Sequence, residues 1–134
     1  MSNEANKSVV IAYLDAFNAR DYEKLRTLFA PDAVVQGVLG KGGLDVVVPI
    51  WRSLHIGLDS RLTLEKISAE ANSVAVLFRE RGRFVGPFLN NEPTGKAYEV
   101  TAMEWFIVRD GRIHQRWGVR DSASIARQVG MPLN

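Results

Sequence analysis

The sequence predicts one α+β domain in which helices from the first half of the chain pack on a curved antiparallel sheet from the second half. Three observations carry this prediction. Apolar residues recur every three or four positions before Gly57, which is typical of helices, and alternate with polar residues after it, which is typical of strands. Asp110-Gly111 lies between the last two alternating segments and is a strong hairpin signal. A chain of 134 residues is long enough for one hydrophobic core, so we expect a single domain over residues 1–134.

Two helices are predicted at the start of the chain. The first covers Ser8–Phe17, where the apolar spacing favours an amphipathic helix. Asp21 is placed to cap a second, shorter helix that carries apolar residues through Phe29, and Pro31 ends it because the residue before a proline avoids helical geometry. The expected buried face of the first helix consists of Val10, Tyr13, Leu14 and Phe17.

A short strand, a loop and a third helix are predicted next. Residues 33–36 form the strand and residues 37–43, which are rich in glycine, form the loop. The third helix covers Leu44–Leu54. Its first residue is not defined by the sequence, because the β-branched residues Val46–Val48 and Pro49 do not favour a helix.

The second half is predicted to form the sheet. Its four strands cover residues 61–68, 74–84, 98–108 and 112–121, and each is bounded by turn residues. A last helix covers Ser122–Val129, and Gly130 ends it.

Three carboxylates fall on strand faces that are otherwise apolar. Alternation along the strands groups Glu80 with valines and phenylalanines, Glu104 with Val100 and Phe106, and Asp121 with Ile113. A buried carboxylate is costly unless it is protonated or hydrogen-bonded, so three of them on one face of a sheet suggest a functional site. The alternative is that each lies exposed near a strand end or pairs with an arginine.

The opposite sheet face carries Met103, Trp105 and Ile107. Since the helices cover the other face, we expect a second copy of the chain to cover this one and predict a homodimer. The alternative is that the Trp105 set faces the core and the Glu104 set faces solvent.

Composition excludes several classes of function. Lysine and arginine exceed aspartate and glutamate by 17 to 15 and are dispersed, which argues against nucleic-acid binding. The chain has no cysteine, two distant histidines and no apolar run long enough to span a membrane. We therefore expect no metal, no cofactor, no membrane partner and a cytoplasmic location.

Several stretches resemble the SnoaL-like polyketide cyclase family of the cone-shaped NTF2-like (cystatin-like) superfamily, which includes ketosteroid isomerase. They are Tyr13–Asp21, Gly86–Phe88, Pro93–Lys96 and the ending from Arg109 through Asp121. The resemblance implies the cone-shaped fold, and it implies that an acid at the end of the last strand acts as base and acid in an intramolecular aldol closure. Asp121 matches that position.

The same resemblance extends to other site residues. Glu104 stands where relatives often have histidine, and Gln36 where they have histidine or asparagine, so both are expected to orient the substrate carbonyl or stabilise its enolate. Phe84 replaces a histidine of many relatives, and Asn90–Glu92 departs from their loop pattern. The expected catalytic residues are therefore Asp121 and Glu104. The expected substrate-binding residues are Tyr13, Phe17, Gln36, Trp51, Glu80, Phe84, Gln115 and Trp117.

The leading hypothesis is a cofactor-independent lyase or isomerase, a polyketide or ester cyclase acting on a small cyclic or polyketide-like ketone. A ketosteroid-isomerase-like activity is less favoured because residues 33–44 contain no acid, and an epoxide-hydrolase-like activity because Ala102 stands where its arginine would be. The remaining alternative is a non-catalytic protein that binds a small apolar or aromatic ligand. A buried Asp121 would favour catalysis, and an exposed one would favour binding.

Overall fold

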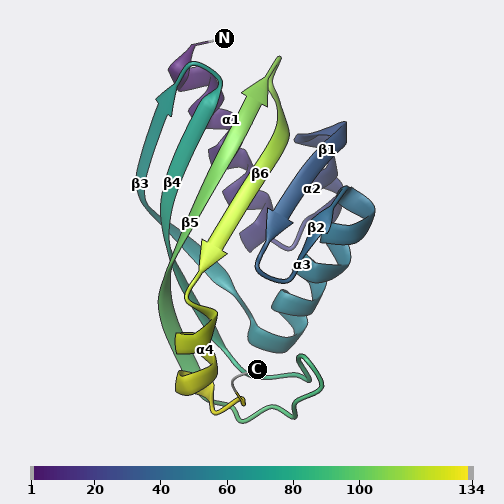
Figure 1. Ribbon diagram of the computed structural model, residues 1–134, viewed down its shortest axis with the longest axis vertical. Helices are drawn as coiled ribbons and strands as arrows, with labels where there is room; N and C mark the ends of the chain where they lie inside the picture. Colours follow the sequence, from purple (N-terminus) through teal and green to yellow (C-terminus); the bar gives the residue numbers. More distant parts are fainter. Residues whose placement is uncertain (1, 133–134) are drawn as a thin grey trace.

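The computed structural model describes residues 2–132, so residues 1 and 133–134 of the predicted domain lie outside the described residues. Helices α1 and α3 lie against one face of a strongly curved sheet, and α4 lies at the end of the sheet near the C-terminus (Figure 1). The helices are α1 Asn3–Asn18, α2 Tyr22–Thr27, α3 Leu44–Leu58 and α4 Ser122–Val129. The strands are β1 Phe29–Gly37, β2 Gly40–Gly42, β3 Arg61–Glu70, β4 Ser73–Arg83, β5 Ala97–Arg109 and β6 Arg112–Arg120. The predicted α+β class is confirmed.

The sheet has the strand order β2-β1-β6-β5-β4-β3. Strands β3 to β6 form the predicted antiparallel meander, and the β5–β6 hairpin turns at Asp110-Gly111 as expected. The sheet is mixed, however, because β1 pairs with β6 in parallel. A sequence read segment by segment gives no sign of this long-range pairing.

The first helices follow their sequence signals. Helix α1 begins at Asn3, before the predicted Ser8, and Ser2 caps it by accepting a hydrogen bond from the Ala5 amide. Asp21 caps α2 by accepting one from the Lys24 amide, as predicted. The α2 prediction is wrong at its end, because the helix stops at Thr27 and Phe29 already begins β1. Pro31 is tolerated in that strand because the β1–β6 ladder is interrupted between Phe29 and Val34.

Two other boundaries differ from the prediction. Part of the predicted 37–43 loop is strand β2, which pairs with β1 as a small hairpin. Helix α3 runs to Leu58, one turn beyond the predicted Leu54, and buries Leu54, His55 and Leu58. This last turn is helical although its own sequence only weakly favours a helix, because its side chains pack against the sheet.

The sheet faces are those predicted for β4 and β5. Val76, Phe78 and Glu80 point inward on β4, and Val100 and Phe106 point inward on β5, all nearly or fully buried. Met103 and Trp105 are about half exposed on the outer face. The alternative in which the Trp105 set faces the core is therefore excluded.

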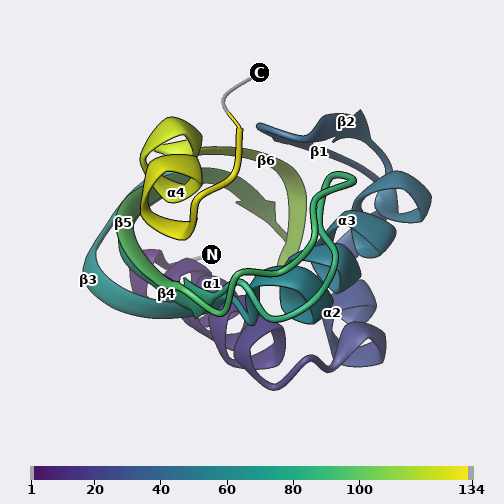
Figure 2. The ribbon, with the colours of Figure 1, turned by 90° about the horizontal axis from the view of Figure 1, so that it is seen from below.

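Two hydrophobic clusters divide the interior. The larger one joins α1, α3 and the upper sheet around Tyr13, Trp51 and Phe106. The smaller one joins α4 to Phe84, Phe88 and the start of β5. In Figure 2, α4, the β4–β5 connection, the β1–β2 hairpin and α3 surround the same end of the sheet. None of the helices within residues 2–132 is long and apolar enough to cross a membrane.

Candidate functional site

A cavity of about 70 Å³ lies between α1, α3 and the inner face of the sheet. Its apolar wall includes Phe17, Val47, Ile50, Trp51, Leu54 and Leu62. Its polar wall comes from strands β4, β5 and β6, the second half of α1 and the connection between α3 and β3. It consists of Tyr13, Ser60, Glu80, Glu104, Arg116 and Arg120. An apolar cavity with a few converging polar groups is the usual form of a small-molecule site.

A β-bulge decides which residues of β6 face this cavity. The register against β5 slips at His114, since Ile107 pairs with Gln115 while Val108 pairs with Ile113. One extra residue moves all later side chains of the strand to the opposite face. Arg116 and Arg120 therefore point inward.

The predicted inward positions of Gln115 and Trp117 are wrong for the same reason. Gln115 is exposed, and Trp117 is 41% exposed on the outer face. Strict alternation assumes a strand without a bulge. It therefore places Gln115 and Trp117 on the same face of the sheet as Ile113.

The first polar cluster, the Glu104 cluster, consists of Glu104, Tyr13 and Arg116. Tyr13 Oη donates a 2.9 Å hydrogen bond to Glu104 Oε1, and Arg116 Nε lies 3.7 Å from the same oxygen. Burial, and next the charge of Glu104, raise the pKa of Tyr13 well above its ordinary value, so this phenol stays protonated and donates. Burial alone would lower the pKa of Arg116, but the interactions with Glu104 and Tyr13 together outweigh burial and raise it. The cluster thus holds one carboxylate between a fixed donor and a fixed cation.

Arg116 has more hydrogen-bond donors than partners. Its side chain is only 8% exposed, yet it makes no hydrogen bond to any described residue, and its Nε is buried without a partner. Gly118 leaves the space for this guanidinium, because a Cβ at that position would lie 2.0 Å from Arg116 Nη1. A buried guanidinium with unused donors at a cavity wall is suited to receive an acceptor from a ligand.

The second polar cluster, the Glu80 cluster, consists of Glu80, Ser60, Tyr98 and Arg120. Glu80 Oε2 accepts hydrogen bonds from Tyr98 Oη at 2.6 Å, Arg120 Nη1 at 2.7 Å and Ser60 Oγ at 3.1 Å. Arg120 pairs in register with Ala102 of β5, a small residue over which its side chain can reach Glu80 on β4. Burial, and next the charge of Glu80, raise the pKa of Tyr98 above its ordinary range. This carboxylate is closely held by its neighbours.

The structure brings half of the predicted site residues together. Tyr13, Phe17, Trp51, Glu80 and Glu104 line the cavity, as their predicted positions require. Their roles in binding or catalysis remain predictions.

The other predicted site residues lie elsewhere. Phe84 is fully buried in the smaller hydrophobic cluster, and Gln36 is exposed because Val35 takes the inward position on β1. Asp121 follows the end of β6, where its exposed side chain caps α4 by accepting a hydrogen bond from the Ser124 amide. The prediction that Asp121 points into the cavity is therefore wrong, and the residue serves the helix that follows it.

Sequence reasoning missed the two arginines of the site and two hydroxyl donors, Ser60 and Tyr98. Strict alternation from Ile113 places both arginines on the outer face, because it takes no account of the bulge. One signal was present: Gly118 sits between Arg116 and Arg120, and a glycine inside a strand often marks a bulge or a close approach. No group of three or more histidine, aspartate or glutamate residues within positions 2–132 is arranged to hold a metal ion.

Comparisons with known proteins agree with this architecture. Wild-type IdmH from Streptomyces antibioticus is 28% identical, with a TM-score of 0.85 over 94% of this chain and 99% of that one. AclR from Streptomyces galilaeus is 20% identical, with a TM-score of 0.88 over 99% of this chain and 89% of that one. TsrD from Streptomyces laurentii is 22% identical, with a TM-score of 0.86 over 98% and 99%. The last two likenesses show the shared fold.

A search of curated proteins finds no match. The family model described as SnoaL-like polyketide cyclase matches residues 7–129, which is nearly the whole chain. The chain therefore belongs to the SnoaL-like polyketide cyclase family.

Proposed function

We propose that this protein is a cofactor-independent acid/base enzyme that enolises a ketone and closes a ring by an intramolecular aldol step. Glu104 is the proton-transfer group and Arg116 the oxyanion donor. The observation that carries the proposal is the buried Arg116 guanidinium, which has unused donors beside the Glu104 carboxylate in the wall of one cavity. The family match, and the description of IdmH as a candidate polyketide cyclase, support the same reaction class.

The reaction balances without a further reactant. The Glu104 carboxylate takes a proton from the carbon next to the substrate carbonyl, and the electron pair moves onto the carbonyl oxygen. Arg116 donates hydrogen bonds to the enolate oxygen, which carries the developing charge. The enolate carbon then attacks a second carbonyl of the same molecule, and protonated Glu104 returns its proton to the new alkoxide.

Tyr13 and Arg116 have separate positioning tasks. Tyr13 holds Oε1 of Glu104 at 2.9 Å, which fixes the carboxylate in the cavity. The charge of Arg116 offsets that of the Glu104 carboxylate, whose side chain is only 11% exposed.

Exchange of α-protons tests the enolisation step alone. In D₂O, we expect the wild-type protein to accelerate deuterium incorporation into 2-butanone, one of the smallest enolisable ketones, as followed by proton NMR. Glu104→Gln and Arg116→Met should each lower this rate by about 10²-fold or more. An unchanged rate in Glu104→Gln would remove Glu104 from the chemistry.

Asp121→Asn provides the matched control. Asparagine preserves the cap of α4, and position 121 lies outside the cavity, so the exchange rate should remain that of the wild type. A large loss in Asp121→Asn would restore the role that the family resemblance implies for this residue.

A non-catalytic ligand-binding protein is the second candidate. It is favoured by the exposure of Asp121 and by the engagement of both cavity carboxylates with arginines. The same assay decides between the two candidates, because a binder would take up 2-butanone without accelerating exchange.

We also propose that the outer sheet face forms a homodimer. Met103, Trp105, Trp117 and Val119 are 41 to 62% exposed there and face one another in register across β5 and β6. A two-fold axis would set this patch against itself. Light scattering should give twice the chain mass for the wild type and a monomer for Trp105→Glu, and a monomeric wild type would refute the dimer.

A further inference from the structure

A second and larger hollow lies next to the catalytic cavity. This outer groove has a volume of about 270 Å³, against about 70 Å³ for the inner cavity. Its apolar wall includes Leu39, Phe88, Leu89, Ile125, Ala126 and Met131. The wall is contributed by α4, the β4–β5 connection and the segment before β2, which surround one end of the sheet (Figure 2).

The groove and the cavity share two residues, Arg120 and Leu39. Arg120 is anchored to Glu80 through Nη1 at 2.7 Å, while its Nε is buried without a partner. The two hollows are therefore neighbours, with Arg120 and Leu39 in the walls of both.

The volumes of the two compartments determine which part of a substrate each of them can hold. An engineered cavity of about 150 Å³ binds benzene. The inner cavity has about half that volume, so it cannot enclose a substrate that carries an aromatic body in addition to its reacting carbonyl groups. Any such body has to lie outside, and the outer groove is the adjoining apolar space.

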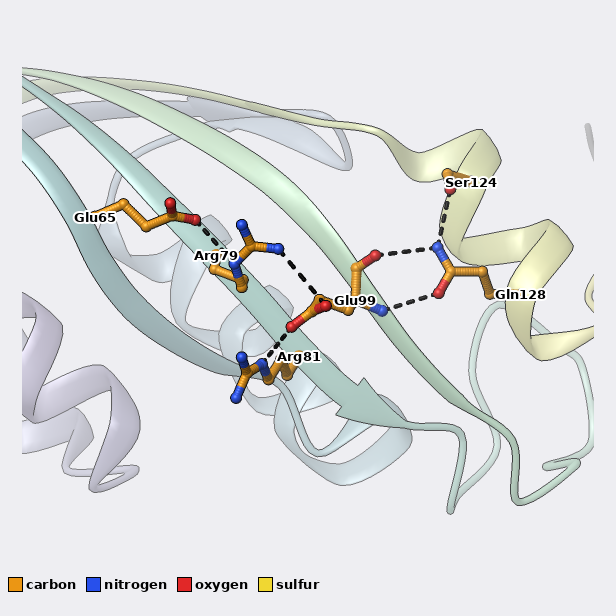
Figure 3. A network of polar contacts seen from close by, with 6 residues as sticks. All are labelled: Glu65, Arg79, Arg81, Glu99, Ser124 and Gln128. Carbon is orange, nitrogen blue, oxygen red and sulfur yellow. Dashed lines mark hydrogen bonds and ion pairs between the residues drawn. The ribbon is translucent and has the colours of Figure 1, made fainter.

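The walls of the groove are held in place. Ile125 and Val129 of α4 are buried against Phe84 and Phe88. On its other side, α4 is tied to β5 by Gln128, whose amide donates to Glu99 O at 3.1 Å and accepts from Glu99 N at 2.9 Å (Figure 3). The side-chain amide of Gln128 thus pairs with the backbone of β5 at a position that lies beyond the end of β6. This pairing holds α4 in place as a wall of the groove.

The tip of the opposing wall is a strained turn. Leu89 and Asn90 both have positive φ, at 48° and 63°, in a two-residue turn closed by mutual backbone hydrogen bonds between Phe88 and Asn91. Leucine is unfavourable in this conformation, and its side chain is 58% exposed. The turn thus presents an exposed apolar side chain at the edge of the groove.

We infer that the outer groove binds the apolar body of a ketone substrate whose carbonyl head enters the inner cavity. The substrate is then a two-part molecule, a small carbonyl head joined to a larger apolar group. The inference rests on the proposed function for the head, and it adds a second binding compartment that sets specificity for the body.

Binding of two ketones tests the inference without requiring turnover. The probes are 2-butanone, which is the head alone, and 4-(2-naphthyl)butan-2-one, which carries a naphthyl body on the same head. Titrations followed by amide chemical shifts should show the naphthyl ketone binding wild type at least tenfold more tightly than 2-butanone. Ala123→Trp places a large side chain in the groove from an exposed position and should remove that advantage while leaving 2-butanone affinity unchanged.

Two further variants sharpen the experiment. Arg127→Trp adds the same side chain to an exposed position of α4 outside the groove wall, and both affinities should stay as in wild type. Leu89→Asn should weaken only the naphthyl ketone, by about threefold, while the melting temperature holds or rises, because asparagine suits a positive φ.

Equal affinities of wild type for the two ketones, or equal naphthyl ketone affinity in wild type and Ala123→Trp, would overturn the inference. Failure of the proposed function gives a different result. In that case Glu104→Gln leaves proton exchange unchanged, while Ala123→Trp still weakens binding of the naphthyl ketone.

Discussion

The Glu80 and Glu104 clusters contain the same kinds of groups but differ in how completely the groups are paired. Each has an inward carboxylate, a tyrosine that donates to it and an arginine from β6. Glu80 accepts three hydrogen bonds at one oxygen, whereas Glu104 accepts one, and its arginine stands 3.7 Å away. A closely paired buried network serves to fix the structure, while an incompletely paired one at a cavity leaves donors for a ligand.

The largest expected effect comes from breaking the pairing of Glu80. Glu80→Gln should lower the free energy of unfolding by about 3–5 kcal/mol, because it leaves the buried Arg120 charge uncompensated. Glu104→Gln, the same change in the Glu104 cluster, also leaves a buried cation, Arg116, but it breaks no direct hydrogen bond from that cation, so it should cost less, about 1–3 kcal/mol. Urea denaturation measures both, and equal losses would erase the distinction between the clusters.

A second variant disturbs the Glu104 cluster without changing its charges. Gly118→Ala places a methyl group against Arg116 Nη1, so the guanidinium must move. Proton exchange into 2-butanone should fall about 10²-fold, as displacement by about 1 Å of a catalytic group typically does. In an Arg116→Met background the same substitution should have little further effect, and full additivity of the two losses would show that Gly118 acts by another route.

His55, a buried histidine outside the cavity, is expected to make the free energy of unfolding depend on pH. Its Nε2 is buried and unpaired, its Nδ1 lies 2.6 Å from Tyr22 Oη, and it is absent from the cavity wall. Burial, and next the charge of Arg20, lower the pKa of His55 to about 4 from 6.5. Between pH 6.5 and 4, His55 therefore binds a proton in the unfolded chain but not in the folded one. Its contribution to the free energy of unfolding is complete above about pH 6.5 and is lost as the pH falls toward 4.

The loss attributable to His55 should be about 1–3 kcal/mol over that interval. It is measured as the difference between wild type and His55→Asn in the pH dependence of unfolding, which cancels the carboxylates common to both. Parallel pH profiles would mean that His55 is charged in the folded protein.

The smallest effect is expected on the outer surface. Glu99 pairs with Arg81 at 2.5 Å and Arg79 at 3.6 Å, and Arg79 also pairs with Glu65, but these side chains are one-third to two-thirds exposed (Figure 3). Glu99→Gln should change the free energy of unfolding by at most about 0.5 kcal/mol, and less at high salt. A loss comparable to that of Glu80→Gln would show that exposure does not separate the two kinds of ion pair.

Much of the fold could be predicted because its signals are local. Helical spacing, the Asp21 cap, the Asp110-Gly111 turn and the Gly130 stop act over a few residues, and the structure has each where the sequence places it. Tyr13, Glu80 and Glu104 could also be assigned to the interior, since alternation in an uninterrupted strand fixes the face.

The remainder of the site depended on distant parts of the chain. The bulge at His114 is a slip in the pairing of β6 with β5, and it exchanged Gln115 and Trp117 for Arg116 and Arg120 at the cavity. Asp121 was misplaced because its local role as cap of α4 overrode the strand pattern.

By itself, the sequence determined that four helices and the strands β3 to β6 form, which side chains face inward on β4 and β5, and that buried acids are present, because these follow from spacing within single segments. Only the tertiary structure decided which cations meet those acids and which of the acids receives no direct hydrogen bond from its arginine. Such pairings join side chains from three strands and a helix, and their geometry is set by register, which no single segment contains.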